Sequence, residues 1–542
     1  MLKNIGIILV LILALFLRSY HLDTLPPAMF SDEVDAGYQA LVFNQNHTDY
    51  YGNKFPTHFH SFSDWRTSLY IYSISLCQKI TNNSDLAIRL PSVIFSVLNV
   101  YLFYLLTNSP LAALLLAISP WSIHYGRTGF EVSGMLAAIL AGIYFWKKYA
   151  QNYRLPHLLL SVFSFALSPY FYSTSKLFLV IIALLIFIIW LSKIKKAKSI
   201  HLVTAAILGL VLLSPLVIDT VRGQAGFRFS YISIFSEPQL SKTTDYLRYR
   251  DIYTTHLGKT GVTPSLSSKI FHNKYSLVLG KFTTNYFSSF STDFLLINGD
   301  QNPRHGFAGH GLLYYLDFFL VIFGLINVLK NHHSDRLGVL FIWMLVLAPI
   351  PFALTRDSLG PHATRLILML PSLIYLSFQG ILYLKFIFKW SLPVILGLYL
   401  ISLSSFWHYY NFDYPQDSAM AWHTGMKEAV LAAKKYQLPT YFSDSYEPFL
   451  PFFLYYEPYL PLHAPASDII HTSNDFFDGS TINNNYYFGH LNWSSLSSIK
   501  TPSLFVVPGT SQVEVPKNLK LLEKIGKRYV NAQDFYLYTN EN

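Results

Sequence analysis

Residues 26–38 read Pro-Pro-Ala-Met-Phe-Ser-Asp-Glu-Val-Asp-Ala-Gly-Tyr and directly follow the first hydrophobic segment of the chain. Ser31 is a good N-cap, and Asp32 and Glu33 suit a first helical turn because carboxylates face the positive end of the helix dipole. Apolar residues then recur at helical spacing, at Val34, Tyr38, Leu41 and Val42. The stretch predicts an amphipathic helix on a membrane surface, with two adjacent carboxylates at its leading end.

The composition is that of a polytopic membrane protein. Of the 542 residues, 52% are hydrophobic and only 13% are charged, whereas about a quarter of the residues in a soluble domain are charged. The net charge of +10 does not indicate nucleic-acid binding, because the basic residues cluster between hydrophobic segments. The single cysteine, Cys77, excludes an internal disulfide and a cysteine-rich metal site.

Hydropathy predicts about eleven transmembrane helices, since about 20 mostly apolar residues cross a bilayer. They are expected near residues 3–20, 86–106, 110–124, 131–147, 155–172, 176–192, 200–218, 311–329, 337–354, 365–385 and 390–407. Residues 67–80 are too short and too polar to span and predict a second interfacial helix. The first segment could also be a signal peptide, but no small-x-small cleavage site follows it, which favours an uncleaved span.

The positive-inside rule places the N-terminus in the cytoplasm, because the basic residues concentrate in the loops on that side. Loops 21–85 and 219–310 then lie outside, as does everything after residue 407. We expect a transmembrane module over residues 1–407 and a small extracytoplasmic α/β domain over residues 408–542. Its predicted helices lie near 418–435 and 447–457, and its predicted strands at 440–442, 504–507 and 535–538.

Ionisable residues collect at the outer ends of the spans, where they are functional candidates. Arg127 and Glu131 are four residues apart and can form a structural ion pair, or one of them can face a reaction cavity. Lys176 lies between two hydrophobic helices. Its amine either meets an anion such as a lipid phosphate or extends to the membrane surface. Tyr170, six residues before Lys176, is a candidate cavity residue together with Glu131, Asp300 and His305.

A second group of polar residues closes loop 219–310. Asp300, Arg304, His305 and His310 are expected close together, and Arg365 lies at the same end of a later span. The turn-forming residues among them also allow a plain turn. Asp300 and the two histidines could in principle bind a divalent metal, but their spacing does not support one, and the chemistry proposed below requires no cofactor.

The ordered set of motifs resembles the GT-C glycosyltransferases that use polyprenyl-phosphate sugars, in families 39 and 83. The resemblance covers residues 1 to about 400. It rests on these stretches: Asp32-Glu33 with Gly37-Tyr38, Arg89-Leu90-Pro91-Ser92, Tyr125-Gly126-Arg127-Thr128-Gly129-Phe130-Glu131 and Gly299-Asp300-Gln301-Asn302-Pro303-Arg304-His305. It implies a GT-C fold, Asp32 as the catalytic carboxylate, Glu33 as an auxiliary group and, more loosely, Lys176 near the donor phosphate.

Such a reaction would move a sugar from a polyprenyl phosphate to an acceptor hydroxyl at the outer face of the membrane. Asp32 would be the general base, and cations would stabilise the departing phosphate. The candidates for this second role are Arg127, Lys176, Arg304 and Arg365. With one candidate base and no obvious carboxylate nucleophile, inversion at the anomeric carbon is expected. The acceptor can be a protein, a glycolipid or a polysaccharide.

Three other classes of protein are weighed against this interpretation. A transporter or flippase of lipid-linked sugars would show repeats and polar groups near the middle of broken spans, whereas the polar groups here lie at span ends. The second class is a different lipid-linked enzyme, such as an O-antigen ligase or an oligosaccharyltransferase. The latter would carry a Trp-Trp-Asp-Tyr-Gly signature, which the sequence lacks. A non-catalytic scaffold would leave Asp32, Glu33 and Lys176 unexplained.

Overall fold

A computed structural model describes residues 2–62, 64–81, 84–222, 232–256, 263–356, 360–456 and 465–541. The chain forms two compact units. The first unit comprises residues 1–173, 205–212 and 397–542, and the second comprises residues 174–204 and 213–396. Within the predicted outer loop 219–310, residues 223–231 and 257–262 lie outside the described residues.

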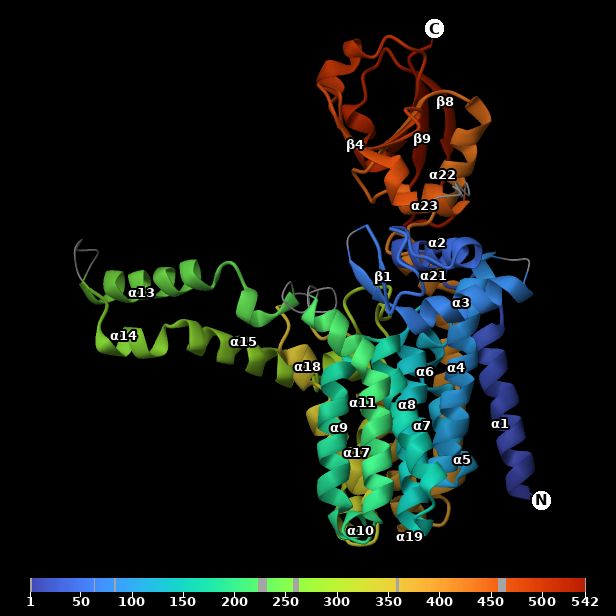
Figure 1. Ribbon diagram of the computed structural model, residues 1–542, viewed down its shortest axis with the longest axis vertical. Helices are drawn as coiled ribbons and strands as arrows, with labels where there is room; N and C mark the ends of the chain where they lie inside the picture. The colour runs from blue at the N-terminus through green and yellow to red at the C-terminus, as the bar shows by residue number, and fades with distance from the viewer. Residues whose placement is uncertain are drawn as a thin grey trace. The chain divides into compact units, whose positions relative to one another are not determined.

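Each of the eleven predicted hydrophobic segments is helical (Figure 1). The helices are α1 (Leu2–Ser19), α4 (Ser84–Thr107), α5 (Pro110–Ile118) with α6 (Pro120–Tyr125), α7 (Val132–Asn152), α8 (Leu155–Phe171), α9 (Ser175–Ile189), α11 (Ser199–Val221), α16 (Tyr315–Lys330), α17 (Arg336–Leu347) with α18 (Ile350–Ala353), α19 (Met369–Ile387) and α20 (Ser391–Phe412). Among the described residues, five stretches are long and apolar enough to cross a membrane, at 85–107, 199–221, 336–353, 369–387 and 391–412. The predicted helical membrane fold is confirmed, and the count of eleven crossings stays a prediction.

Two predicted spans are interrupted at prolines. The span expected over 110–124 breaks at Ser119, whose backbone is extended, and a new helix begins at Pro120. The span expected over 337–354 breaks before Pro349, which precedes the short α18. Proline lacks an amide hydrogen and disfavours a helical residue before it, which accounts for the first of these breaks.

The helix α2 spans Ser31–Asn46 and contains the two adjacent carboxylates. Phe30 is its N-cap, and no side chain caps it, so the prediction of Ser31 as the cap is wrong by one residue. Nine of its sixteen residues are buried, because α2 packs against α4, α3 (Ser68–Ile80) and α23 (Leu450–Tyr456). It is therefore an internal helix of the first unit and not the surface helix that the sequence predicts.

A short hairpin connects α2 to α3. Its strands are β1 (His58–His60) and β2 (Trp65–Thr67), which pair antiparallel. The sequence predicts no strands here. Thr67 ends β2 and donates from its hydroxyl to the carbonyl of Phe171 at 2.6 Å, which ties the hairpin to the end of α8.

The C-terminal part of the first unit is a seven-stranded mixed sheet with helices, as the α/β prediction requires. The strands are β3 (Thr440–Ser443), β4 (Ile469–Ser473), β5 (Phe477–Ile482), β6 (Tyr486–Leu491), β7 (Leu504–Pro508), β8 (Lys520–Ile525) and β9 (Phe535–Thr539). Their order is β4-β5-β6-β3-β7-β9-β8, and β3 is parallel to both β6 and β7. The helix predicted near 418–435 is shorter: α21 is Tyr414–Ser418 and α22 is Met426–Ala433.

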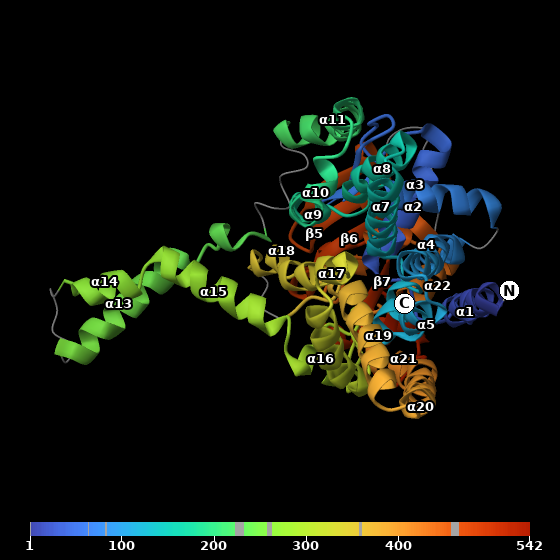
Figure 2. The same cartoon turned by 90° about the horizontal axis from the view of Figure 1, so that it is seen from below.

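Helices pack closely within each unit. In the first unit α7 packs against α4 and α8 (Figure 2). In the second unit α16 and α19 approach at glycines: a Cβ on Gly324 would lie 1.9 Å from the Leu376 carbonyl oxygen, and one on Gly380 would lie 2.0 Å from that of Leu320. Close contact through small residues is typical of helices packed within a membrane.

The carboxyl group of Asp444 follows the central strand β3 of the sheet. Burial raises its pKa from 3.8 to about 7. The amide of Phe449, which donates to Oδ1 at 2.9 Å, opposes this shift, and the nearby carboxylate of Glu447 adds to it. Because the folded chain binds this proton more tightly than the unfolded chain does, stability falls as the pH rises from about 4 to about 7.

We expect Asp444→Asn to remove this pH dependence, because an amide keeps the Oδ1 acceptor and carries no charge. The variant should melt at a higher temperature than wild type at pH 8 and at a similar temperature at pH 4. Thermal unfolding across this pH range measures the effect, with Asp475→Asn, an exposed carboxylate in the same domain, as the control. Parallel curves for Asp444→Asn and wild type would contradict the assignment.

Candidate active site

The two adjacent carboxylates of α2 have different environments. The side chain of Asp32 is 57% exposed, whereas that of Glu33 is fully buried. Successive residues of a helix are rotated by about 100°, so the two side chains leave α2 in different directions. The two adjacent carboxylates therefore differ: that of Asp32 is accessible, and that of Glu33 is internal.

Glu33 forms a two-pronged ion pair with Arg89 of α4. Arg89 donates from Nε to Oε1 and from a terminal nitrogen to Oε2, both at 3.0 Å. The amide of Gly129 also donates to Oε1, at 2.6 Å. A side chain at residue 129 would collide with Glu33, since a Cβ there would lie 2.8 Å from its Cγ. The glycine of the quoted motif is therefore needed to bring this amide to the carboxylate.

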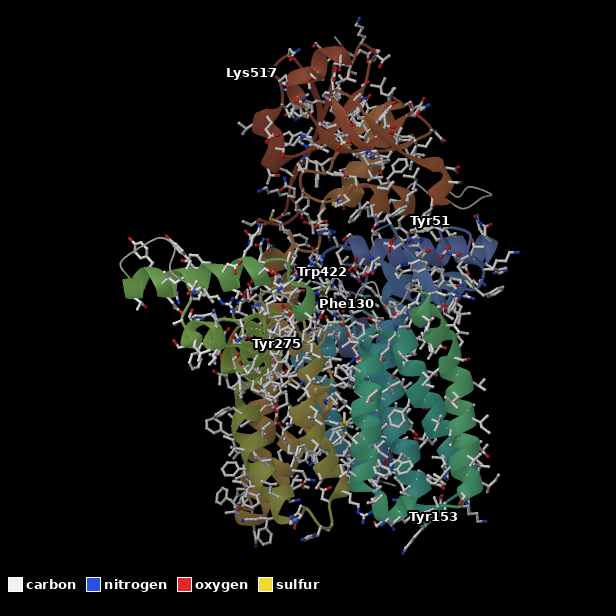
Figure 3. All side chains as sticks on the ribbon, turned by 60° about the vertical axis from the view of Figure 1, so that its left-hand side comes forward. Tyr51, Phe130, Tyr153, Tyr275, Trp422 and Lys517 are labelled. Carbon is white, nitrogen blue, oxygen red and sulfur yellow. The ribbon has the colours of Figure 1, made fainter. Side chains whose placement is uncertain are left out.

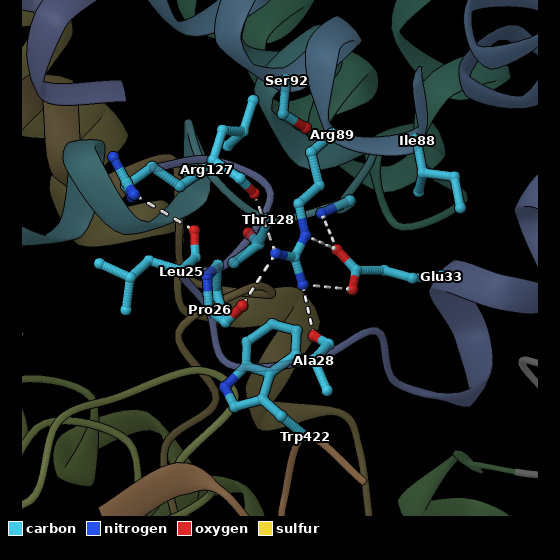
Figure 4. A network of polar contacts seen from close by, with 12 residues as sticks. Leu25, Pro26, Ala28, Glu33, Ile88, Arg89, Ser92, Arg127, Thr128 and Trp422 are labelled. Atoms are coloured by element: carbon cyan, nitrogen blue, oxygen red, sulfur yellow. Dashed lines mark hydrogen bonds and ion pairs between the residues drawn. The ribbon is translucent and has the colours of Figure 1, made fainter. Parts of the chain in front are cut away.

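The remaining donors of Arg89 bind the segment between α1 and α2 (Figure 4). They reach the carbonyl oxygens of Leu22 at 3.2 Å, Pro26 at 3.0 Å and Ala28. The ring of Trp422 covers the guanidinium, with its centroid 5.5 Å from Cζ. The ion pair is thus satisfied entirely by protein groups, which indicates a structural role for Glu33 in place of the expected auxiliary catalytic one.

Aromatic rings seal this region of the first unit. Phe30 lies 5.3 Å from Trp422 and 5.2 Å from Phe130, measured between ring centroids. Figure 3 shows Phe130 and Trp422 at one end of the helices and Tyr153, after α7, at the other. Phe30, Phe130 and Trp422, which are far apart in the sequence, therefore pack together as one apolar layer over the ion pair.

Arg127 is also buried and engaged by protein. Its terminal nitrogens donate to the carbonyl oxygens of Leu17 at 2.9 Å, Tyr20 at 2.6 Å and Leu25 at 3.2 Å. Its guanidinium lies 5.4 Å from the ring centroid of Tyr410. A phosphate would have to displace these carbonyls, so the geometry argues against the predicted phosphate-binding role of Arg127.

Arg66 and Asp35 are site residues that the sequence reasoning missed. Arg66, in β2, donates to Asp32 Oδ1 at 2.8 Å and also pairs with Asp35. Asp35 accepts further hydrogen bonds from Tyr50 at 2.9 Å and Ser61 at 2.9 Å. Asp35 lies one turn after Asp32 on α2, and this i, i+3 spacing was the available signal. No local pattern connects Arg66 to either of them.

Charge around Arg66 is strongly negative. Burial disfavours its charged form, yet the pKa of Arg66 is raised well above the usual value by Asp32 and Asp35, with a smaller contribution from Glu131. Glu131, the half-buried residue before α7, therefore interacts with Arg66. Tyr170 of α8, another candidate cavity residue, donates its hydroxyl to the carbonyl of Leu212 at 2.6 Å. Arg66 thus remains a cation that holds the exposed carboxylate of Asp32.

Predicted residues of the second unit form their own polar cluster. Asp300 accepts the amide of Ala363 at 2.8 Å and lies 3.7 Å from His362 Nδ1. The rings of His305 and His362 are 4.5 Å apart, and His305 Nδ1 is 3.1 Å from the hydroxyl of Thr364. The turn-forming residues at 298–306 are thus held by these contacts with residues 362–364.

The predicted cations of the second unit lie at a helix start or in turns. Arg365 donates to the hydroxyl of Thr355 at 3.0 Å, and Arg304 lies in the turn with Asp300. Lys176 is the second residue of α9 and interacts electrostatically with Asp219. Among the described residues, no group of three or more His, Cys, Asp or Glu side chains is placed to hold a metal ion. The roles of these residues stay predictions.

We expect Arg89→Met to lower the free energy of unfolding by about 3–5 kcal/mol, because it leaves the buried Glu33 without its partner. Lys435→Met is the matched control: Lys435 pairs with Glu523 at 3.0 Å, but its side chain is 63% exposed, and such pairs contribute about 0–1 kcal/mol. Unfolding of the purified full chain in detergent measures both. Equal stability of the two variants would contradict a structural role for the Glu33–Arg89 pair.

Comparison with known solved structures gives distant matches. The oligosaccharyltransferase AglB of Archaeoglobus fulgidus, in complex with an inhibitory peptide and a dolichol-phosphate, is 13% identical over 88% of this chain and 61% of its own, with a TM-score of 0.45. ArnT from Cupriavidus metallidurans in the apo state is 9% identical over 99% of this chain and 97% of its own, with a TM-score of 0.40. This chain spans about three fifths of the length of the oligosaccharyltransferase.

Comparison with curated protein sequences finds no match. Residues 66–218 match the model of a family described as dolichyl-phosphate-mannose-protein mannosyltransferase. The matched part begins at Arg66 and contains Arg89, Arg127 and Glu131, whereas Asp32 and Glu33 precede it. The resemblance to GT-C glycosyltransferases expected from the sequence is thus confirmed for residues 66–218, which are similar to this family of mannosyltransferases.

Proposed function

We propose that the protein is a membrane glycosyltransferase that moves a sugar from a polyprenyl-phosphate donor to an acceptor hydroxyl. The observation that carries this proposal is the exposed carboxylate of Asp32, which Arg66 holds at the start of a buried helix. The family match over residues 66–218 supports it, because that family is described as using dolichyl-phosphate mannose. The same description favours a protein acceptor, and the sugar can be a hexose or a pentose.

Asp32 is the proposed general base. Its carboxylate accepts the proton of the acceptor hydroxyl while that oxygen attacks the anomeric carbon. A new carbon–oxygen bond forms as the bond from the anomeric carbon to the phosphate oxygen breaks, and the polyprenyl phosphate leaves with the electron pair. A single displacement of this kind inverts the anomeric centre. Asp35 is buried beneath Arg66 and serves to position it, and Glu33 anchors the start of α2.

The departing phosphate needs cations, because charge develops on it in the transition state. For this role we propose Lys176 at the start of α9, together with Arg304 and Arg365, which lie in turns. The residues proposed to line the reaction cavity are Glu131, Asp300, His305 and Tyr170. We propose an active site on the extracytoplasmic side, from the distribution of basic residues, and a reaction that needs no metal.

We expect Asp32→Asn to lower the transfer rate by about 100-fold to 10,000-fold, the usual contribution of a general base. The assay is sugar transfer by purified protein in nanodiscs, with radiolabelled polyprenyl-phosphate sugars as donors, beginning with mannose. Asp23→Asn, an exposed carboxylate nine residues earlier, should leave the rate unchanged. Equal rates for wild type and Asp32→Asn would remove Asp32 as the base. Absence of transfer by wild type from every donor would favour transport of lipid-linked sugars.

We expect Arg66→Gln to lower the transfer rate by about 100-fold through misplacement of Asp32, although it removes no reacting group. Arg66→Lys should recover part of the activity, because an ammonium keeps the charge but not the two-pronged geometry. The same assay measures both variants, and the KM for the donor should change little. A raised KM with an unchanged kcat would instead indicate that Arg66 binds the donor.

A further inference from the structure

Three helices of the second unit form a projecting arm, which we define as α13 (Leu240–His256), α14 (Leu266–Phe271) and α15 (Lys274–Ser288). Figures 1 and 2 both show α13 and α15 side by side, extending from α18. The arm exposes many large apolar and aromatic side chains: Tyr246, Tyr249, Tyr253, Leu266, Ile270, Phe271, Tyr275, Leu279 and Phe287. Contiguous exposed surfaces of this kind mark interaction sites.

The segment before α13 and the end of α15 are both hydrogen-bonded to the end of a membrane-crossing stretch. Residues 336–353 are long and apolar enough to span. On one side, the amide of Ile234 donates to the carbonyl of Leu354 at 3.0 Å. On the other, Asn285 donates from its side chain to the carbonyl of Thr355 at 2.8 Å, and the Tyr286 hydroxyl donates to that of Val346 at 2.9 Å. The arm therefore starts at the level where this span leaves the bilayer.

One face of α15 is apolar along its whole length. Tyr275, Leu279, Phe282 and Tyr286 follow at i, i+4, i+7 and i+11, which places them in one stripe. At the root, Tyr286 of this stripe contacts α17, which belongs to the span. Farther out, the stripe is uncovered, and Tyr275 is 88% and Leu279 62% exposed. The apolar stripe that contacts α17 at Tyr286 thus continues along α15 away from the span. It stays at the level of the bilayer surface, where lipid would contact it.

The charges of the arm suit anionic headgroups. Lys274 and Lys281 lie seven residues apart on one flank of the apolar stripe, so their amines can reach the phosphate level while their stems cover lipid. The described part of the arm has six basic and two acidic residues: Lys242, Arg248, Arg250, Lys269, Lys274 and Lys281 against Asp245 and Asp251. A basic amphipathic helix with aromatic residues is typical of a membrane surface.

The helix α13 stiffens this surface. His272 pairs with Asp251 of α13 at 3.1 Å, and Arg248 donates from Nε to the carbonyl of His272 at 2.7 Å. Its uncovered face presents tyrosines together with basic residues: Lys242, Tyr246, Tyr249, Arg250 and Tyr253. Tyrosine and basic side chains concentrate at membrane–water boundaries. The contacts of His272 with α13 therefore hold the helices of the arm together as one element.

We infer that the arm is a membrane-binding element, which lies on the bilayer surface with the stripe of α15 in the boundary between headgroups and acyl chains. Its occupant is a lipid surface with anionic headgroups. A protein partner is disfavoured because the stripe continues the surface of a membrane-crossing helix. This inference concerns the second unit and does not depend on the proposed transfer reaction.

The test uses the full chain in nanodiscs with one environment-sensitive fluorophore. Cys77→Ser removes the single cysteine, and Leu279→Cys then places a label on the stripe. Thr284→Cys, exposed on another face of α15, is the matched control. Nitroxide-bearing lipids should quench the label at 279 at least threefold more than that at 284, and aqueous iodide should show the reverse order. Iodide quenching at 279 equal to that at 284, with no lipid quenching, would overturn the inference.

Headgroup charge is tested in the same system. Lipid quenching at 279 should at least double when neutral phosphatidylcholine discs are replaced by discs with about a third phosphatidylglycerol. Lys274→Gln with Lys281→Gln should abolish that increase, since screening or removing the basic flank removes the attraction. An increase that survives the double substitution, or no increase at all, would overturn the anionic preference.

Discussion

The first unit depends on one buried ion pair, Glu33–Arg89. Moving two charges out of water is expensive, and their attraction compensates only when the geometry is good and the remaining donors are satisfied. Here Arg89 also binds carbonyls of the segment between α1 and α2, and Glu33 accepts the amide of Gly129. The pair therefore joins α2, α4, the linker before α2 and the turn before α7 at one point.

This constraint explains how two neighbouring carboxylates acquire separate tasks. Because Glu33 is fixed inward, the helical rotation leaves Asp32 pointing elsewhere, where β2 supplies Arg66. Asp35 beneath Arg66 is itself held by Tyr50 and Ser61. Arg66 thus holds the accessible carboxylate, and Asp35 holds Arg66 in turn. For the base that we propose, this support limits the rearrangement that is needed when a hydroxyl arrives.

The helices of the predicted spans were predictable because long apolar runs determine them, and β3, β7 and β9 were predictable because their residues are buried and rich in β-formers. The strands β4, β5, β6 and β8 were missed. No residue of β4 is buried, and β5 contains Asp478 and Gly479, which are unfavourable in strands. The surface position expected for α2 was wrong, because its cover comes from α23, far away in the sequence. A buried arginine such as Arg127 looks the same in sequence as one that binds phosphate, and only its carbonyl partners distinguish the two.

The contacts between the early helices and the C-terminal part also constrain how the chain can be assembled. Lys427 pairs with Asp85 at 2.6 Å across 342 residues, and His124 meets the Tyr410 hydroxyl at 3.1 Å across 286 residues. When the first helices leave the ribosome, the ring that covers Arg89 has not been synthesised. The early segments must therefore wait in the membrane with an incompletely covered charge pair, and folding of this unit can finish only after nearly the whole chain is made.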